Sequence, residues 1–128
     1  MVIDSSALVA ILLEEAEGER FLDLIAKGGT KLISAANAFE AGIVLEARAG
    51  EAAGREFDLF LYDADVKVMP VDSDLVAVAR TTWRKYGKGR HPAALNFGDC
   101  FAYALAKISG EPLLAKGDDF RRTDIELC

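Results

Sequence analysis

The sequence predicts a single α/β domain built on a mainly parallel sheet. Short apolar runs alternate along the chain with longer segments of helical periodicity, a pattern typical of parallel strands joined by right-handed helical crossovers. The length of 128 residues is that of one domain able to bury a sizeable core. Because no repeat, linker or low-complexity segment interrupts the pattern, we treat residues 1–128 as one domain.

Helix-capping residues and glycines mark the expected elements in the first half of the chain. Residues 2–3 are a short strand, and Asp4-Ser5-Ser6 then begins a helix. A second helix covers about residues 17–27 and ends at Gly28-Gly29. The next strand is expected at residues 31–33, followed by a helix that Ser34 caps and by another over residues 51–62.

The second half repeats this alternation around one strongly apolar helix. Residues 66–71 are the third strand, Asp72 caps the next helix, and residues 87–95 form a basic loop. Asn96 then caps a helix that runs to about Ile108 and is apolar nearly all round, so it is expected to be packed on most sides. Residues 113–115 are the fourth strand, with a possible short fifth strand at residues 125–127.

Acidic residues stand at four of these apolar elements. Asp4 follows the first strand, Glu40 lies in an apolar helix, Asp99 lies in the first turn of the Asn96-capped helix, and Asp118-Asp119 follow the fourth strand. Ligands bind at the carboxyl ends of parallel strands, where Asp4 and the Asp118-Asp119 pair are therefore expected. Taken alone, Asp99 also fits a first-turn acid that the helix dipole stabilises.

Glu40 is the least ordinary of these acids. Positions 36, 40, 43, 44 and 47 share one helical face, so Glu40 is expected among apolar side chains. An unpaired carboxylate there would be costly, so it should have a cation, a metal ion or its own proton as a partner. A salt bridge to Arg20 or Arg48 is the alternative.

Converging acids would imply a bound cation. Two like charges 4 Å apart repel by about 4 kcal/mol at an effective dielectric of 20, so several acids cannot all stay ionised unaided. Oxygen ligands in a chain with one histidine favour Mg²⁺ or Mn²⁺ over zinc. Such a metal beside a basic groove fits phosphodiester cleavage, in which the metal lowers the pKa of a bound water.

A basic segment offers that groove, although the net charge of the chain is −6. No acidic residue occurs from Leu75 to Gly98, a window that interleaves Trp83, Tyr86 and His91 with Arg80, Arg84, Lys85, Lys88 and Arg90. Cations and aromatic rings together can follow a phosphate backbone and stack on bases. A solvated helix face ending in a glycine-containing loop is the alternative interpretation. His91 suits a phosphate contact or a loop position better than a general base.

Four motifs resemble one known family over the whole chain. They are Val2-Ile3-Asp4-Ser5-Ser6-Ala7, Asn37-Ala38-Phe39-Glu40-Ala41, the stretch from Asn96 to Ala106, and Leu113–Phe120 followed by Thr123-Asp124-Ile125. In this order they resemble the PIN-domain ribonucleases, specifically the VapC toxins of prokaryotic toxin–antitoxin pairs. The last two motifs are the most specific, and Ser5 stands where many members have threonine.

The resemblance implies both a fold and an activity. It implies a three-layer α/β/α domain, endoribonuclease activity on structured RNA such as tRNA or rRNA with Mg²⁺ or Mn²⁺, a homodimer, and a cognate antitoxin. By motif position, Asp4, Glu40 and Asp99 bind the metal, the fourth ligand comes from the Asp118-Asp119 pair and is assigned to Asp118, and all five acids are catalytic. The expected RNA contacts are Arg84, Lys85, Lys88, Arg90 and His91.

Two other functional classes compete with this interpretation. A receiver-like phosphoacceptor domain would use Asp4 and Lys116, but it needs an adjacent acidic pair after the first strand and an aspartate ending the third, where Met69-Pro70-Val71 stands. A catalytically silent RNA- or partner-binding domain would keep the acids as structural residues. With no run of about 20 apolar residues and no basic leader before Asp4, we expect a cytoplasmic protein without membrane contact.

Overall fold

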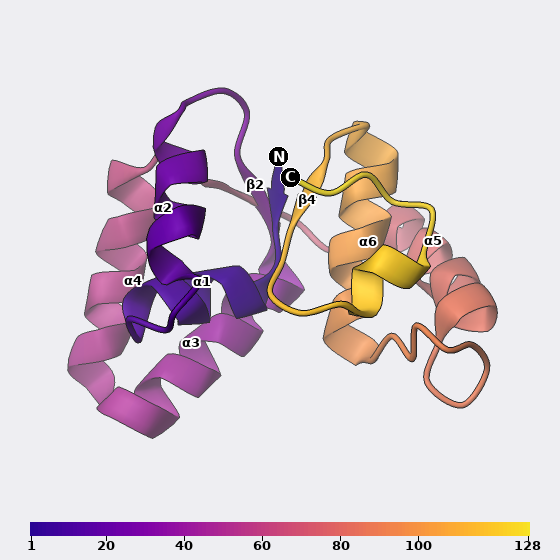
Figure 1. The fold of residues 1–128 in the computed structure, drawn as a ribbon, viewed down its shortest axis with the longest axis horizontal. Coiled ribbons are helices and arrows are strands. Elements are labelled where there is room, and N and C mark those ends of the chain that lie inside the picture. Colours follow the sequence, from indigo (N-terminus) through magenta and orange to yellow (C-terminus); the bar gives the residue numbers. More distant parts are fainter.

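A four-stranded sheet forms the centre of the computed structural model, which describes residues 1–128 (Figure 1). The strands are β1 (Val2–Ile3), β2 (Leu32–Ser34), β3 (Lys67–Met69) and β4 (Leu113–Leu114). Their order is β3-β2-β1-β4, and every neighbouring pair is parallel. The predicted parallel α/β sheet is thereby confirmed.

Helices cover both faces of this sheet. One layer contains α1 (Ser5–Leu12), α2 (Gly18–Ala26), α3 (Ala35–Ala49) and α4 (Glu51–Asp63). The other contains α5 (Ser73–Tyr86), α6 (Phe97–Ser109) and the short 3-10 helix η1 (Asp119–Arg122). The domain therefore has the three layers α/β/α.

Alternating strand residues divide the core into two halves. Successive side chains of a strand point to opposite faces of its sheet. Val2, Leu32 and Leu113 accordingly join the core under α5 and α6, whereas their neighbours Ile3, Ile33 and Leu114 join the core under α1 to α4. Strands of two or three residues thus suffice to support both layers.

The predicted helix caps are confirmed. The side chains of four residues each accept a backbone N–H at the start of a helix, namely Asp4, Ser34, Asp72 and Asn96. Such a cap is worth about 1 kcal/mol. At the other end of α6, Gly110 adopts the left-handed conformation with a φ of 70°, as its position after Ser109 predicts.

Two strand predictions need correction. The third strand was expected over residues 66–71 but covers only Lys67–Met69, because Pro70 has no N–H to extend the pairing and β3 lies at the sheet edge. Residues 125–127 do not form a fifth strand. Only Leu127 bridges Leu113, since the preceding segment turns through η1 and is held against α6 by Asp124.

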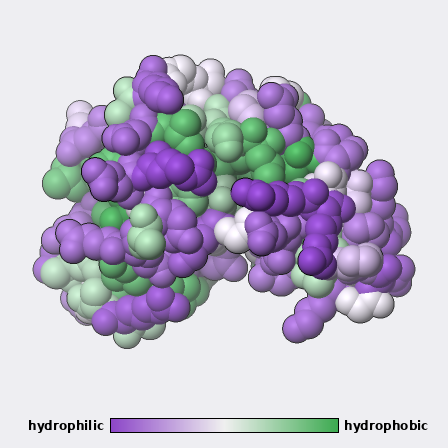
Figure 2. Space-filling model, viewed as in Figure 1, coloured by the Kyte–Doolittle hydropathy of each residue, from purple (hydrophilic) through white to green (hydrophobic).

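The strand order locates the edge of the sheet at which a site is expected. The chain adds β2 and β3 on one side of β1 and then returns to place β4 on its other side. This reversal makes β1 and β4 the switch point, and α/β sheets bind ligands outside the carboxyl ends of such strands. These ends lie at the lower edge of the sheet in Figure 1, where α6 begins, and Figure 2 shows the surface indented there. No helix in the structure combines the length and apolarity needed to cross a bilayer.

Candidate active site

Asp4 lies at the carboxyl end of β1 and is only 3% exposed. Its Oδ2 atom accepts hydrogen bonds from the Ser6 backbone N–H at 3.0 Å and from Ser6 Oγ at 2.6 Å. Its Oδ1 atom is buried and has no hydrogen-bond partner. Burial raises the pKa of Asp4, the Ser6 hydrogen bonds oppose this effect, and the charge of Glu40 adds to it. Asp4 therefore offers one buried carboxylate oxygen free to meet a cation.

Ser6 joins the two strands of the switch point. Besides donating to Asp4, Ser6 Oγ accepts a hydrogen bond from the Lys116 backbone N–H at 2.9 Å. The segment that leaves β4 is thereby fixed beside the end of β1. The sequence predicts Ser6 only as one of the residues that begin the helix. Its contact with Lys116 could not be predicted, because the two residues are 110 positions apart.

Glu40 projects from α3 toward the first turn of α6. Its carboxylate accepts a hydrogen bond from Ser5 Oγ and lies so close to Gly98 that a Cβ atom there would be 2.4 Å from Glu40 Oε2. The alternative interpretation, a salt bridge to Arg20 or Arg48, is wrong, since neither pair forms. Glu40 is thus held by a hydroxyl and by its position over a glycine.

The predicted neighbours of Glu40 are confirmed in part, since Ala36, Ile43 and Val44 line one hollow with it, but this face of α3 is not buried in the core. The buried face of α3 consists of Asn37, Ala41 and Leu45, and Glu40 is half-buried beside it. Ile43 is 53% exposed. The reason is that α3 packs against α1, α4 and α6, so these neighbours decide which side of the helix is buried.

Asn37 connects α3 to α6 beneath the acids. It is fully buried, and its Nδ2 atom donates a hydrogen bond to the Gly98 carbonyl at 2.9 Å, while its Oδ1 atom has no partner. Asn37 precedes Glu40 by nearly one helical turn, and Gly98 precedes Asp99. This single hydrogen bond therefore fixes the two helices that carry Glu40 and Asp99 relative to each other. The sequence analysis did not predict this role for Asn37, and the only signal for it was a polar residue within an apolar helix.

Asp99 serves both as a helix cap and as a member of the acidic group. Asn96 Oδ1 accepts the Asp99 N–H at 2.9 Å, and Asp99 Oδ2 accepts the Asn96 N–H at 3.0 Å. The pKa of Asp99 is raised to about 7, mainly by burial and also by the charges of Asp4, Asp119 and Glu40, against the lowering effect of the Asn96 hydrogen bond. Acids from four separate segments therefore act on one another here.

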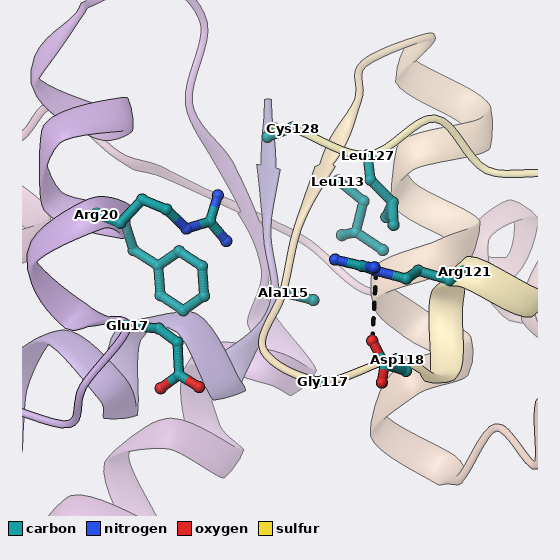
Figure 3. A pocket seen from close by; sticks show the side chains of 10 residues that line it. Glu17, Arg20, Leu113, Ala115, Gly117, Asp118, Arg121, Leu127 and Cys128 are labelled. Carbon is teal, nitrogen blue, oxygen red and sulfur yellow. Dashed lines mark ion pairs between the residues drawn. The ribbon is translucent and has the colours of Figure 1, made fainter.

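The two neighbouring aspartates after β4 are both exposed but have different partners. Asp119 begins η1 and is among the charges that raise the pKa of Asp99. Asp118 Oδ1 lies 3.3 Å from Arg121 Nε, and the Asp118 side chain is 79% exposed. Figure 3 shows this pair in a pocket that Glu17 and Arg20 line from the opposite side. Asp118 is therefore paired with Arg121, whereas the charge of Asp119 acts on Asp99.

The acidic group is open rather than a closed cage. No three histidine, cysteine, aspartate or glutamate side chains are arranged closely enough to enclose one metal ion. Asp4, Glu40 and Asp119 nevertheless lie near enough to Asp99 for their charges to raise its pKa, and the charge of Glu40 also raises the pKa of Asp4.

The predicted RNA contacts lie on α5 and on the loop that leads into α6. Arg84, Lys85, Lys88 and Arg90 are exposed, and none of them forms an ion pair. His91 is half-buried, packs edge-on against Tyr86 with ring centroids 5.0 Å apart, and accepts the Ala93 N–H through Nδ1. The four cations are therefore available to a ligand, whereas His91 shapes the loop.

Sequence comparison identifies relatives of nearly the same length. The family model described as PIN domain matches residues 1–126. Ribonuclease VapC30 of Mycobacterium tuberculosis is 54% identical over 125 residues, which cover 98% of this chain and 95% of that protein. Ribonuclease VapC of Mycolicibacterium smegmatis is 53% identical over 125 residues, covering 98% of this chain and 97% of that protein.

Solved structures share the fold at lower sequence identity. Mycobacterium tuberculosis VapC20, described as a sarcin-ricin loop cleaving toxin, has a TM-score of 0.80 and 19% identity, covering 97% of this chain and 95% of its own. Rickettsia felis VapBC2, bound to a DNA fragment from its promoter, has a TM-score of 0.74 and 16% identity, covering 99% and 96%. These findings confirm the resemblance and rule out the receiver-like alternative. The chain belongs to the PIN-domain family and, within it, to the VapC ribonucleases.

Proposed function

We propose that this protein is a toxin that cleaves RNA as a divalent-metal-dependent endoribonuclease. The observation that carries the proposal is the buried Asp4 carboxylate at the carboxyl end of β1, whose Oδ1 has no hydrogen-bond partner and which lies near enough to Glu40 and Asp99 for these charges to act on one another. Grouped carboxylates repel one another, and a cation offsets that repulsion. Relatives that are 53% and 54% identical to this chain are named VapC ribonucleases, which supports RNA as the substrate.

The residues present fit Mg²⁺ or Mn²⁺. The available donors are carboxylate oxygens, and Asp4 Oδ1 is buried without a partner. Mg²⁺ keeps several water ligands and commonly uses only one or two carboxylates, which suits an open acidic group. Of Asp4, Glu40, Asp99 and Asp119, one or two would contact the ion directly and the others would act through its water ligands. When bound, such an ion lowers the pKa of a coordinated water and offsets charge on the leaving oxygen.

The neighbouring side chains orient these carboxylates before any ligand arrives. Ser6 holds Asp4 Oδ2 and leaves Oδ1 free, Ser5 holds Glu40, and the Asn96 cap holds Asp99. Hydrogen bonds to ligating groups fix their orientation and contribute to metal affinity. The site is therefore largely assembled by contacts within the chain.

The basic segment would hold the RNA backbone. Arg84, Lys85, Lys88 and Arg90 are exposed and unpaired, so they can neutralise phosphates, and His91 supports the loop that presents them. We expect the substrate to be a structured RNA such as tRNA or rRNA. The description of VapC20, a relative in fold, as a sarcin-ricin loop cleaving toxin supports a structured target.

Protein partners are part of the proposal. Fold neighbours include a toxin–antitoxin complex from Klebsiella pneumoniae, with a TM-score of 0.71 and 15% identity over 93% of this chain, and Rickettsia felis VapBC2. We expect an antitoxin to bind this chain and the toxin itself to form a homodimer. Large apolar side chains exposed on α3 and α4 give surface for a protein contact, namely Phe39, Leu59 and Tyr62.

Cleavage of purified RNA tests the proposed activity. The protein, freed of any co-purified antitoxin, is incubated with total tRNA and rRNA in Mg²⁺ or Mn²⁺ and then in EDTA. We expect discrete fragments that require metal, that disappear with Asp99→Asn, and that persist with Asp58→Asn, a control on the exposed face of α4. Intact RNA together with tight binding that does not depend on Asp99 would instead indicate a catalytically silent domain.

A further inference from the structure

An apolar groove opens between α5 and α6. It has a volume of about 350 Å³, and its apolar walls include Val76, Ala79, Trp83, Phe97 and Phe101. Trp83 is 46% exposed and Phe97 is 80% exposed, and Phe97 stands edge-on to Phe101 with ring centroids 5.0 Å apart. Exposed aromatic rings that line an open groove are typical of a surface that binds a ligand.

The groove carries positive charge at its border. Arg80 forms part of the lining, and the Arg90 guanidinium lies 4.2 Å from the centroid of the Trp83 ring. Neither arginine forms an ion pair, and the chain has no acidic residue from Leu75 to Gly98. In a protein with a net charge of −6, this concentration of unpaired cations is matched to a negatively charged ligand.

The groove also adjoins the acidic group. Phe97 forms one of its walls and, on its other side, lines a second hollow together with Glu40 and Gly98. Asp99 follows two residues after Phe97 in the first turn of α6. A ligand seated against Phe97 would therefore extend directly toward the proposed metal-binding acids.

We propose that this groove binds an unpaired nucleobase of the RNA substrate, stacked against Trp83 and Phe97, with the adjoining phosphate held by Arg80 and Arg90. The inference rests on the proposed ribonuclease function and adds a base-binding subsite to it. Nucleobases are flat and stack on aromatic side chains, whereas the attached phosphates require cations, and the groove supplies both. Bases in a continuous duplex are not free to enter, so cleavage would occur beside single-stranded or looped nucleotides.

The fluorescence of Trp83, which is the only tryptophan of the chain, reports occupancy of the groove directly. The Asp99→Asn variant is titrated in EDTA with a short single-stranded RNA and with a matching ribose-phosphate oligomer that lacks bases. We expect the RNA to quench the fluorescence and the abasic oligomer to leave it nearly unchanged. Because no metal and no cleavage are involved, this result is independent of whether the wild-type protein proves to be a nuclease.

Substitutions separate base binding from protein contact. Phe97→Ala is expected to lower the affinity for the RNA oligomer at least about 10-fold. Tyr62→Ala, which removes an exposed aromatic ring from α4, should leave this affinity unchanged. Phe97 is mostly exposed, so its removal should not unfold the domain, and thermal unfolding checks this. Equal quenching by the abasic oligomer would overturn the proposal. So would a Phe97→Ala variant that binds RNA normally but changes the oligomeric state in light scattering, since the groove would then be a protein interface.

Discussion

Replacing Gly98 with alanine tests whether the position of Glu40 controls the acidic site. The added Cβ would lie 2.4 Å from Glu40 Oε2 and 2.7 Å from Oε1, whereas ordinary contacts begin at 3.4 Å. The Glu40 carboxylate must therefore move by about 1 Å, which also weakens its hydrogen bond to Ser5. Misplacement of an active-site group by about 1 Å can cost about 100-fold in rate. We expect Gly98→Ala to lower RNA cleavage by about that factor.

The same substitution should leave stability nearly unchanged. Alanine favours the helix over glycine by about 1 kcal/mol, and the loss of one hydrogen bond costs about 1 kcal/mol. Urea unfolding and Mn²⁺ titration calorimetry, run beside the cleavage assay, separate the two effects. Gly54→Ala is a matched control, since its Cβ would lie 2.4 Å from Oε1 of Glu46, an exposed residue of α3, and it should cleave like wild type. A Gly98→Ala protein with normal Mn²⁺ affinity and normal cleavage would refute the assignment of Glu40.

Three further predictions concern the neighbouring residues. Asp119→Asn should reduce the rate of RNA cleavage more than 10-fold. Asp118→Asn loses only an exposed ion pair with Arg121, so its cleavage rate should stay near that of the wild type. The opposite result for the two variants would restore Asp118 as the proposed ligand. Because the pKa of Asp99 is raised from 3.8 to about 7, the metal-free fold loses stability as pH rises between these values. Asp99→Asn should remove that slope in thermal unfolding in EDTA, and an unchanged slope would contradict the raised pKa. Asn37→Leu should weaken Mn²⁺ binding about 10-fold in calorimetry without a large loss of stability, and unaltered affinity would show that its bond to Gly98 is purely structural.

Much of the fold was predictable because its signals are local. Asn96 and Gly110 bound α6 through capping chemistry that acts within one helical turn, and both do so in the structure. Asp4 was predictable as a site residue for a topological reason, since it directly follows a strand and the carboxyl ends of parallel strands lie at one edge. Both inferences needed only residues adjacent in the sequence.

The surroundings of Glu40 and the role of Asn37 depend on tertiary contacts. Apolar residues occur on more than one face of α3. Periodicity alone therefore does not show which of these faces is buried in the core and which stays exposed. The hydrogen bond from Asn37 reaches Gly98, 61 residues later. Likewise, the turn into η1 brings Arg121 Nε within 3.3 Å of Asp118 Oδ1, and no pattern in the sequence distinguishes this pair from one between Arg121 and Asp119.

The acids of the proposed site are spread from residue 4 to residue 119 of the 128-residue chain. No fragment of the fold brings them together, since each is delivered by a different segment and the last arrives only when η1 packs beside α6 through Phe120. If these acids form the catalytic site as proposed, a chain that stops before η1 lacks one of them and should cleave RNA poorly or not at all. A truncated chain that ends before residue 118, compared with the full chain in the cleavage assay, checks this expectation.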